Sequence, residues 1–169
     1  TKGSKEFPYS LSSSPDGKRI AAAGGATSSG ARGRAIVWNA DNGRELFTLV
    51  GQHGRVWTVA FSPDGRRLAT GAEDGIVRVW DSSDGRRLLV IPAHAETVLD
   101  VAFSPDGKRI ASGGGSVLTV DHGELKIWNA ETGAEIFSLQ GHTSPVYDVS
   151  FSPDGRRLAS ASADSSVKV

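Results

Sequence analysis

The stretch FSPDGRRLAT, residues 61–70, decides the fold because the chain repeats it in slightly altered form. Related copies are SPDGKRIAA from Ser14, SPDGKRIAS from Ser104 and SPDGRRLAS from Ser152. In each copy the proline presets φ, the aspartate side chain caps the turn and the glycine accepts a positive φ, which predicts a short hairpin loop. The sequence therefore predicts a strand, a tight turn and a second strand, four times over.

The repeats alternate in length. Tryptophan closes three similar strands, RAIVWNA, IVRVWDS and ELKIWNA, and the step from Trp38 to Trp80 is shorter than the step from Trp80 to Trp128. The Ser-Pro-Asp-Gly turns likewise follow one another at a long, a short and again a long step. A combined unit of two repeats recurs, because NADNGRELFTL at 39–49 returns as NAETGAEIFSL at 129–139. Such regular self-similarity indicates an array of similar structural units.

Each unit is expected to contain four β-strands. Apolar residues alternate or run together over four to seven positions in VWTVAFS, RLATGA, IVRVW and RRLLVI, which favours strands over helices. Turn sequences such as DSSDG and NAETG separate the third and fourth strands. Four antiparallel strands within roughly 40 to 50 residues are typical of a propeller blade. We therefore expect an all-β propeller with blades at 1–48, 49–90, 91–138 and, incomplete, 139–169.

A family resemblance covers essentially the whole chain. The segments GHTSPVYDVSFSPDGRRLASASADSSVKV (141–169), AHAETVLDVAFSPDGKRIAS (93–112) and GAEDGIVRVWD (71–81) resemble the WD-repeat propeller family. The FSPDG[KR]R spelling is similar to that of bacterial members, where such domains often accompany signalling kinases. Two departures stand out: only Trp80 is followed by aspartate, and Ser13 stands where the other blades have phenylalanine.

The resemblance implies a structural role for a set of serine, histidine and aspartate residues. In that family a histidine, a serine or threonine, an aspartate and the closing tryptophan form a buried hydrogen-bonded tetrad within a blade. The matching positions, which are not expected to form a hydrolase triad, are Thr70, Asp74, Trp80, His94, Ser112, Trp128, His142, Ser160 and Asp164. Blade 2 has Gln52 at the histidine position, blade 3 has a displaced Asp121, and blade 1 has neither the histidine nor the aspartate. These three blades should therefore be less tightly tied, at about 1–3 kcal/mol per unmade buried hydrogen bond.

Composition argues against several function classes. Nineteen basic and nineteen acidic residues give no net charge, which favours neither nucleic acid nor an anionic membrane as a partner. A chain without cysteine has no disulfide, thiolate metal site or thiol nucleophile. Four scattered histidines and glycine clusters without a following Gly-Lys-Ser/Thr predict no metal and no cofactor. No apolar run approaches the ~20 residues of a membrane helix, and residues 1–12 lack a signal pattern.

Surface recognition is the function that remains. The resemblance implies that the loops leading into each first strand, with those between second and third strands, form one face that binds proteins or peptides. The matching positions on this loop face are Phe7, Tyr9, Arg55, Trp57, Glu73, Thr97, Leu99, Pro145 and Tyr147. Insertions within 24–34 and 113–123 would wall a groove there. The alternative is that Trp57, Leu99 and Tyr147 simply pack between blades.

Paired basic residues follow every Ser-Pro-Asp-Gly turn, on the opposite or turn face. These pairs are Lys18 with Arg19, Arg66 with Arg67, Lys108 with Arg109, and Arg156 with Arg157. They would form either a basic ring or a solvated rim offset by the turn aspartates Asp16, Asp64, Asp106 and Asp154.

Closure of the ring is the last question that the sequence raises. Two complete combined units would be slightly longer than the chain, and seven or eight blades usually close such a ring. An open array leaves bare blade faces, so we expect either a homodimer of eight blades or a piece of a longer propeller. The absence of methionine favours a processed, excised or engineered chain. The predicted function is a non-catalytic scaffold that binds protein or peptide; the alternatives are a self-assembling fragment and a propeller enzyme with an axial site.

Overall fold

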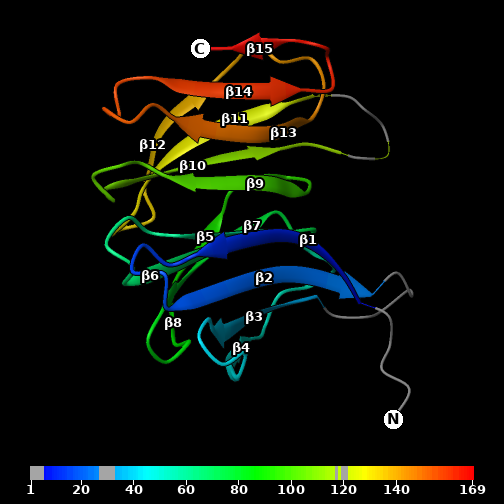
Figure 1. Ribbon diagram of the computed structural model, residues 1–169. Coiled ribbons are helices and arrows are strands. Elements are labelled where there is room, and N and C mark those ends of the chain that lie inside the picture. The colour runs from blue at the N-terminus through cyan, green and yellow to red at the C-terminus, as the bar shows by residue number, and fades with distance from the viewer. Residues whose placement is uncertain (1–5, 27–32, 117, 119–121) are drawn as a thin grey trace.

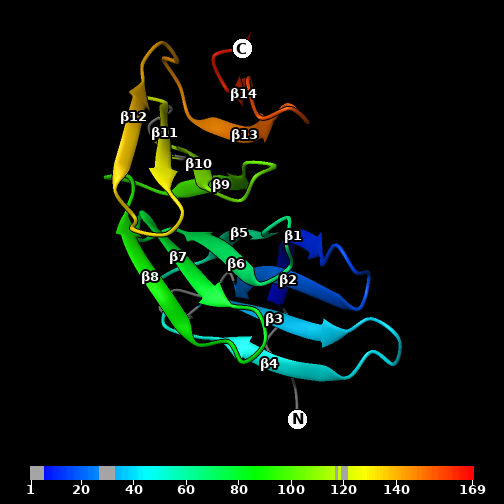
Figure 2. The ribbon, with the colours of Figure 1, turned by 90° about the vertical axis from the view of Figure 1, so that its left-hand side faces the viewer.

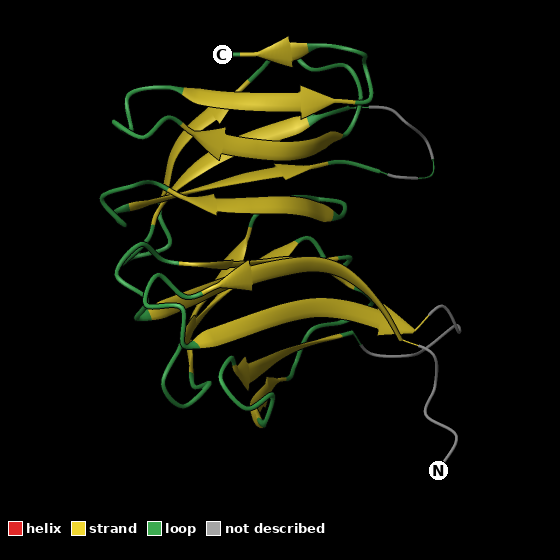
Figure 3. Ribbon diagram, viewed as in Figure 1, coloured by secondary structure: helices red, strands yellow, loops and turns green. Residues whose placement is uncertain are grey.

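The computed structural model describes residues 6–26, 33–116, 118 and 122–169, apart from the side chains of Glu6, Phe7 and Ala26. These residues form four antiparallel sheets joined by turns and loops, with no helix among them (Figures 1 and 3). No segment of the described chain is therefore a helix long and apolar enough to cross a membrane. The all-β propeller class predicted from the period-two pattern is confirmed.

Each sheet is a meander that corresponds to one predicted blade, with strands paired in sequence order. Blade 1 contains β1 (Glu6–Ser13), β2 (Arg19–Ala26), β3 (Arg34–Asn39) and β4 (Glu45–Leu49). Blade 2 contains β5 (Val56–Phe61), β6 (Arg67–Ala72), β7 (Ile76–Asp81) and β8 (Arg87–Pro92). Blade 3 contains β9 (Val98–Phe103), β10 (Arg109–Gly114), β11 (Glu124–Asn129) and β12 (Glu135–Leu139). Blade 4 has three described strands, β13 (Val146–Phe151), β14 (Leu158–Ser162) and β15 (Val167–Lys168).

The Ser-Pro-Asp-Gly segments form the hairpin turns that join the first two strands of each blade. In blade 2 the Ser62 hydroxyl donates to the Asp64 carboxylate at 2.6 Å and accepts the Arg67 N–H at 2.9 Å. Asp64 also accepts the Arg66 N–H at 3.0 Å, and Gly65 has a φ of 69°. The hydrogen bond from Ser62 lowers the pKa of the Asp64 carboxyl below its usual value. The turn thus satisfies its own polar groups, which suits a unit used four times.

The hydrophobic core lies between blades rather than within one. Figure 2 shows the sheets as a fan, with first strands β5, β9 and β13 toward one side and β4, β8 and β12 along the other. We call the side of a blade that meets the preceding blade its front and the other side its back. The back of blade 1 packs Ala21 and Val37 against Val59, Leu68 and Trp80 on the front of blade 2. The junction of blades 2 and 3 repeats this arrangement, so front and back are complementary surfaces.

Polar contacts join successive first strands in the same register at each junction. The Val59 N–H donates to the Ser10 hydroxyl at 3.2 Å, and the Val101 N–H to the Thr58 hydroxyl at 3.4 Å. At the last junction the Val149 N–H donates to the Asp100 carboxylate at 3.0 Å. At each of these junctions a side chain therefore accepts an N–H from the following blade, and in blade 1 the Ser12 hydroxyl also accepts the Phe61 N–H at 3.1 Å.

Arginines on the turn face also join neighbouring blades. The guanidinium groups donate to the glycine carbonyl of the next turn: Arg19 to Gly65 at 3.0 Å, Arg67 to Gly107 at 2.7 Å and Arg109 to Gly155 at 2.7 Å. Each guanidinium carbon also lies 5.2–5.6 Å from the centroid of the phenylalanine ring that closes the next first strand. The expectation of a basic ring or a solvated rim was therefore incomplete, since these three arginines connect blades. In their three pairs only the first member is exposed, whereas both Arg156 and Arg157 are exposed in the fourth.

The first and last blades of the fan each present an uncovered face. On the front of blade 1, Leu11 is 71% exposed, whereas its counterpart Val59 is 3% exposed. On the back of blade 4, Val169 is 83% exposed, whereas its counterpart Val79 is fully buried. These two faces correspond to the two halves of every internal junction.

Candidate protein-binding face

Four of the predicted contact residues form one cluster at the loop face, between blades 1 and 2. The rings of Tyr9 on β1 and Trp57 on β5 lie 4.7 Å apart between centroids, tilted by 34°. The Arg55 guanidinium lies 6.0 Å from the Trp57 ring centroid and 3.3 Å from a carboxylate oxygen of Glu73. Glu73 also accepts the Arg55 N–H at 2.9 Å. The cluster is an aromatic pair flanked by a paired cation, a combination suited to anchoring a partner.

Gly54 allows the approach that builds this cluster. Its φ is 74°, in the left-handed region, and a Cβ atom at this position would collide with the Glu73 side chain. Glycine alone tolerates both conditions without strain. The loop that leads into β5 is thereby held close to Glu73, which fixes Arg55 beside Trp57.

The other predicted contact residues do not join the cluster. Thr97, Leu99 and Pro145 are buried. The alternative interpretation, packing between blades, named only Leu99 among these three. Tyr147 on β13 is 49% exposed, and it lies on blade 4, away from Tyr9 and Trp57. The side chain of Phe7 and most of the insertions at 27–32 and 117–121 lie outside the described residues.

In blade 3, hydrogen bonds link tryptophan, serine, histidine and glutamate. The Trp128 Nε1–H donates to Ser112 Oγ at 2.9 Å, Ser112 Oγ lies 2.8 Å from His94 Nε2, and His94 Nδ1 lies 2.7 Å from Glu124 Oε2. The carboxylate is Glu124, not the predicted Asp121, which lies outside the described residues. Sequence reading missed Glu124 because the insertion moved the acidic residue from the turn to the start of β11.

Donors and acceptors assign the protons along this chain. A carboxylate only accepts, so His94 Nδ1 carries the hydrogen and Nε2 accepts the Ser112 O–H. Burial lowers the pKa of His94 despite the neighbouring Glu124, which keeps the ring neutral near pH 7. Ser112 is fully buried and receives the indole N–H, so its hydroxyl cannot meet a substrate. The geometry is that of a structural network.

Blade 4 has the same histidine–hydroxyl and histidine–carboxylate contacts as blade 3. His142 Nε2 lies 2.8 Å from Ser160 Oγ, and His142 Nδ1 lies 2.8 Å from Asp164 Oδ2. Hydrogen bonds from Ser166 and then His142 hold the pKa of Asp164 far below its usual value. All three predicted residues of this blade are thus brought together.

Blade 2 keeps only one link of this network. The Trp80 Nε1–H donates to Thr70 Oγ1 at 2.9 Å. Gln52 is fully buried at the histidine position, and neither polar atom of its side chain has a hydrogen-bond partner among the described residues. Asp74 turns away to Arg78, whose Nη2 lies 2.7 Å from Asp74 Oδ2. Burial would raise the pKa of Asp74, but the hydrogen bonds from Arg78 and the His53 N–H outweigh it and lower the pKa.

Asp100 is a further acid, half-buried, that sequence reading missed. It accepts the Thr58 O–H at 2.8 Å and the Val149 N–H at 3.0 Å, so it connects the first strands of three blades. Burial, assisted by the negative charge of Asp148, raises the pKa of Asp100 to about 6. The sequence signal available was that the equivalent position is polar in every blade, with Ser10, Thr58 and Asp148 in the other three.

Comparisons with known proteins follow the same repeats. Residues 43–81, 85–129 and 133–169 match the family described as "WD domain, G-beta repeat". Among the described residues, no group of three or more histidine, aspartate or glutamate side chains is placed to hold a metal ion.

Curated relatives share part of the chain. Protein HIR1 of Gibberella zeae and protein hir-1 of Neurospora crassa are each 38% identical to it over 85 residues, covering 43% of this chain. WD repeat-containing protein SL1-17 of Schistosoma mansoni is 42% identical over 52 residues, covering 31%. The match spans 8% of each of the two fungal proteins and 17% of the Schistosoma protein. These relatives are fungal and animal, and they lend no support to a bacterial type of repeat.

Proposed function

Because the chain belongs to the WD-domain, G-beta-repeat family, we propose that it is a non-catalytic scaffold that binds a protein or peptide at its loop face. The observation that carries this proposal is the cluster of Tyr9, Trp57, Arg55 and Glu73. WD repeats generally mediate contacts between proteins. The cluster supplies the residue types that dominate such contacts.

The cluster suits recognition because its geometry is set before a partner arrives. Tyr9 is 37% exposed and is supported from behind by Trp57. The Glu73 carboxylate holds Arg55, so few rotamers are lost when a partner covers the cluster. The chain has no net charge, so contact area at the aromatic pair, rather than a long-range field, would provide the affinity.

A peptide-display selection tests this proposal. Random peptides would be selected on the immobilised chain, and the enriched peptides titrated against Tyr9→Ala and Trp57→Ala. The matched control is Phe137→Ala, which removes an exposed aromatic side chain from outer strand β12. We expect each cluster variant to weaken binding by about tenfold or more, as for an interface anchor, and the control to leave it unchanged. Enriched peptides that ignore both cluster substitutions would overturn the proposal.

The enzyme alternative finds little support in the candidate nucleophiles. Ser112 and Ser160 are buried and bonded to histidine within their own blades. The acids that approach one another on the first strands, Asp100 and Asp148, have no histidine or arginine partner in the described part of the chain. We therefore propose a scaffold without an active site.

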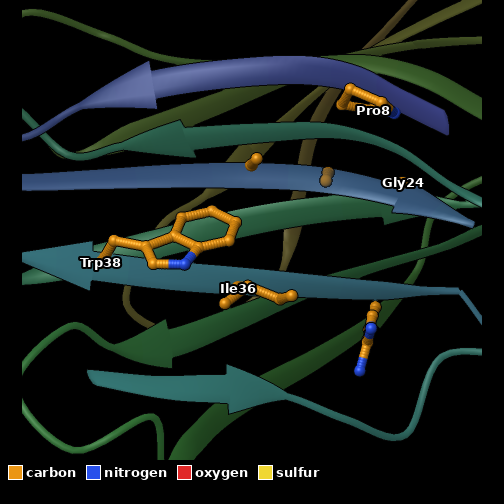
Figure 4. Close-up of a pocket in the computed structure, with 7 residues that line it drawn as sticks. Pro8, Gly24, Ile36 and Trp38 are labelled. Atoms are coloured by element: carbon orange, nitrogen blue, oxygen red, sulfur yellow. The ribbon is translucent and has the colours of Figure 1, made fainter. Parts of the chain in front are cut away.

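A second candidate function is self-assembly, in which two chains pair into a homodimer of eight blades. The observation that favours it is the pair of uncovered faces at the two ends of the fan. Figure 4 shows the front of blade 1, where Pro8, Gly24, Ile36 and Trp38 line a shallow pocket. The corresponding faces of blades 2 and 3 are covered by the blade before them. Light scattering on a sizing column tests the pairing, because a dimer has twice the 17.7 kDa mass of the chain.

A further inference from the structure

We propose that Asp148 and Arg157 on blade 4 are the two polar contacts that receive blade 1 of a second copy. The Asp148 carboxylate would accept the N–H of Leu11, and the Arg157 guanidinium would donate to the carbonyl of Gly17. This proposal rests on the pairing of two chains proposed above, and it names the atoms that set the register of the pair.

The first contact continues a series that is present at every internal junction. Ser10, Thr58 and Asp100 each accept the N–H of a residue in the next first strand. Asp148 is the fourth member of this series by position, on β13. Its side chain is exposed and makes no hydrogen bond within the described residues, although its charge acts on Asp100. A blade packed on the back of blade 4 would therefore bring an N–H to this carboxylate.

Blade 1 carries the matching donor. Leu11 pairs with Ala22 across β1 and β2, as Val59 pairs with Thr70 across β5 and β6. In blade 2 this register points the Val59 N–H toward the preceding blade. By the same register the Leu11 N–H points away from β2, at the free edge of blade 1 that β1 forms.

The second contact continues the series on the turn face. Arg19, Arg67 and Arg109 each donate to the glycine carbonyl of the following turn. Arg157 is the fourth arginine of this series, and its guanidinium is exposed with no partner among the described residues. The carbonyl that corresponds to Gly65, Gly107 and Gly155 in blade 1 is that of Gly17.

Apolar surfaces of the two faces also match. Leu11 and Ile20 are exposed on the front of blade 1, where Val59 and Leu68 are buried in blade 2. Val167 and Val169 are exposed on the back of blade 4, where Val77 and Val79 are buried in blade 2. A second copy is the occupant we propose, because one chain carries both complementary halves and two head-to-tail junctions close a symmetric pair.

One feature makes this junction weaker than the internal ones. Ser13 replaces the phenylalanine that each internal arginine covers, so Arg157 would meet no aromatic ring. A Ser13→Phe variant would restore that contact. We expect it to lower the dimer dissociation constant on the order of tenfold, because an exposed cation–π contact would form at both junctions of the pair.

Analytical ultracentrifugation over a dilution series tests the proposed contacts on the intact chain. We expect Asp148→Ala and Arg157→Ala each to raise the dimer dissociation constant about a hundredfold, since each removes one charged hydrogen bond at both junctions of the pair. Arg156→Ala is the matched control on the same exposed turn, where only the backbone N–H is hydrogen-bonded, and it should stay within about twofold of the parent. Circular dichroism and tryptophan fluorescence would verify that each variant folds.

A Leu11→Pro variant sharpens the assignment because it removes the N–H itself. Proline is tolerated on an edge strand where the N–H points away from the sheet. Leu11→Ala is the control for loss of the side chain. The double variant Leu11→Pro/Asp148→Ala should lose less free energy of dimerisation than the two single variants lose together, because both remove the same hydrogen bond. A dimer indifferent to Asp148 and Arg157 would overturn these contacts and leave the pairing intact. A parent chain that stays monomeric at every concentration would overturn both.

Discussion

Blades 2 and 3 each bury a tryptophan at the junction with the preceding blade, but the hydrogen-bond networks around the two tryptophans differ. In blade 3 four side chains, Trp128, Ser112, His94 and Glu124, are joined in one hydrogen-bonded chain. In blade 2 only the Trp80–Thr70 bond remains, and a fully buried Gln52 takes the histidine position without a partner in the described part of the chain. Both tryptophans are nevertheless buried to nearly the same extent.

This difference separates two roles within a blade. The tryptophan and the hydroxyl that receives its N–H are common to both blades, so they are what the blade-to-blade core requires. In blade 3, His94 and Glu124 extend the tryptophan–hydroxyl hydrogen bond toward the loop face. In blade 2 no histidine stands at the equivalent position, and Asp74 pairs with Arg78 instead. We infer that the extension adds local rigidity to a blade whose burial is already determined by apolar packing.

The largest expected effect is the removal of the hydroxyl that blade 3 shares between two partners. Ser112→Ala leaves both the Trp128 N–H and His94 Nε2 buried without a partner, at about 1–3 kcal/mol each. Thr70→Val removes the hydroxyl in blade 2 at nearly constant volume and leaves only the Trp80 N–H unpaired. We expect Ser112→Ala to lower the free energy of unfolding about twice as much, measured by urea denaturation with tryptophan fluorescence. Equal losses would contradict the comparison.

A change of opposite sign is expected at Gln52. Replacing this residue with leucine removes two buried polar atoms that lack partners and keeps a similar volume. Gln52→Leu should raise the free energy of unfolding by about 1 kcal/mol. The matched control is His94→Leu, which breaks the blade 3 network and should destabilise the fold. A lower free energy of unfolding for Gln52→Leu would contradict this prediction, because it would mean that the Gln52 amide makes stabilising hydrogen bonds.

The two blades should also differ in their response to acid. Burial lowers the pKa of His94 in the folded chain below the ~6.5 of an unfolded histidine, so the unfolded state binds more protons as pH falls below that value. Stability from blade 3 is therefore present at neutral pH and is lost as pH falls. A His94→Gln variant, which resembles blade 2, should show a flatter stability profile between pH 7 and 5.

Asp100 must be separated from this effect. Its folded pKa of about 6 exceeds its unfolded value, so its contribution is fully present at low pH and is lost as pH rises through 6. In the parent chain His94 and Asp100 both contribute to the pH dependence of the free energy of unfolding. Subtracting the profile of His94→Gln from that of the parent leaves the contribution of the histidine. An unchanged profile in that variant would refute the assignment of a neutral buried imidazole.

The smallest expected effect concerns the carboxylate at the end of the blade 3 network. Glu124 is partly exposed, and Lys126 lies 3.5 Å away from it. Glu124→Gln keeps an oxygen acceptor for the His94 Nδ1–H, so we expect a loss of at most about 1 kcal/mol. Hydrogen exchange at β10 and β11 is the sensitive measurement. A loss as large as that of Ser112→Ala would give the charge itself a structural role.

Several features of the fold were predictable from short patterns. Period-two apolar runs and the Ser-Pro-Asp-Gly turns predicted the strands, because both are local properties of a few consecutive residues. The resemblance to the WD-repeat family implied contacts among Trp128, Ser112 and His94, and the structure places these side chains in hydrogen-bond contact. Glu124 was missed because the insertion before β11 changed the register locally.

Contacts across blades were not predictable in the same way. Arg67 read as part of a basic pair on a rim, yet its guanidinium reaches Gly107 and lies over Phe103 of the next blade. Nothing in the sequence pattern singled out Asp100, yet it accepts hydrogen bonds from the blades on both sides. Of the predicted loop-face residues, Tyr9, Arg55, Trp57 and Glu73 meet, whereas Thr97, Leu99 and Pro145 are buried.

The sequence by itself determined that this chain is a series of antiparallel β-blades, the last of them incomplete, because side-chain alternation and turn chemistry act over a few residues. Only the tertiary structure decided which side chains bridge the blades and which are left on open faces. Neighbouring blades bring together side chains that lie far apart along the chain, as with Thr58 and Asp100 or Ser10 and Val59. Such contacts depend on how whole sheets pack, and a local pattern carries no record of that packing.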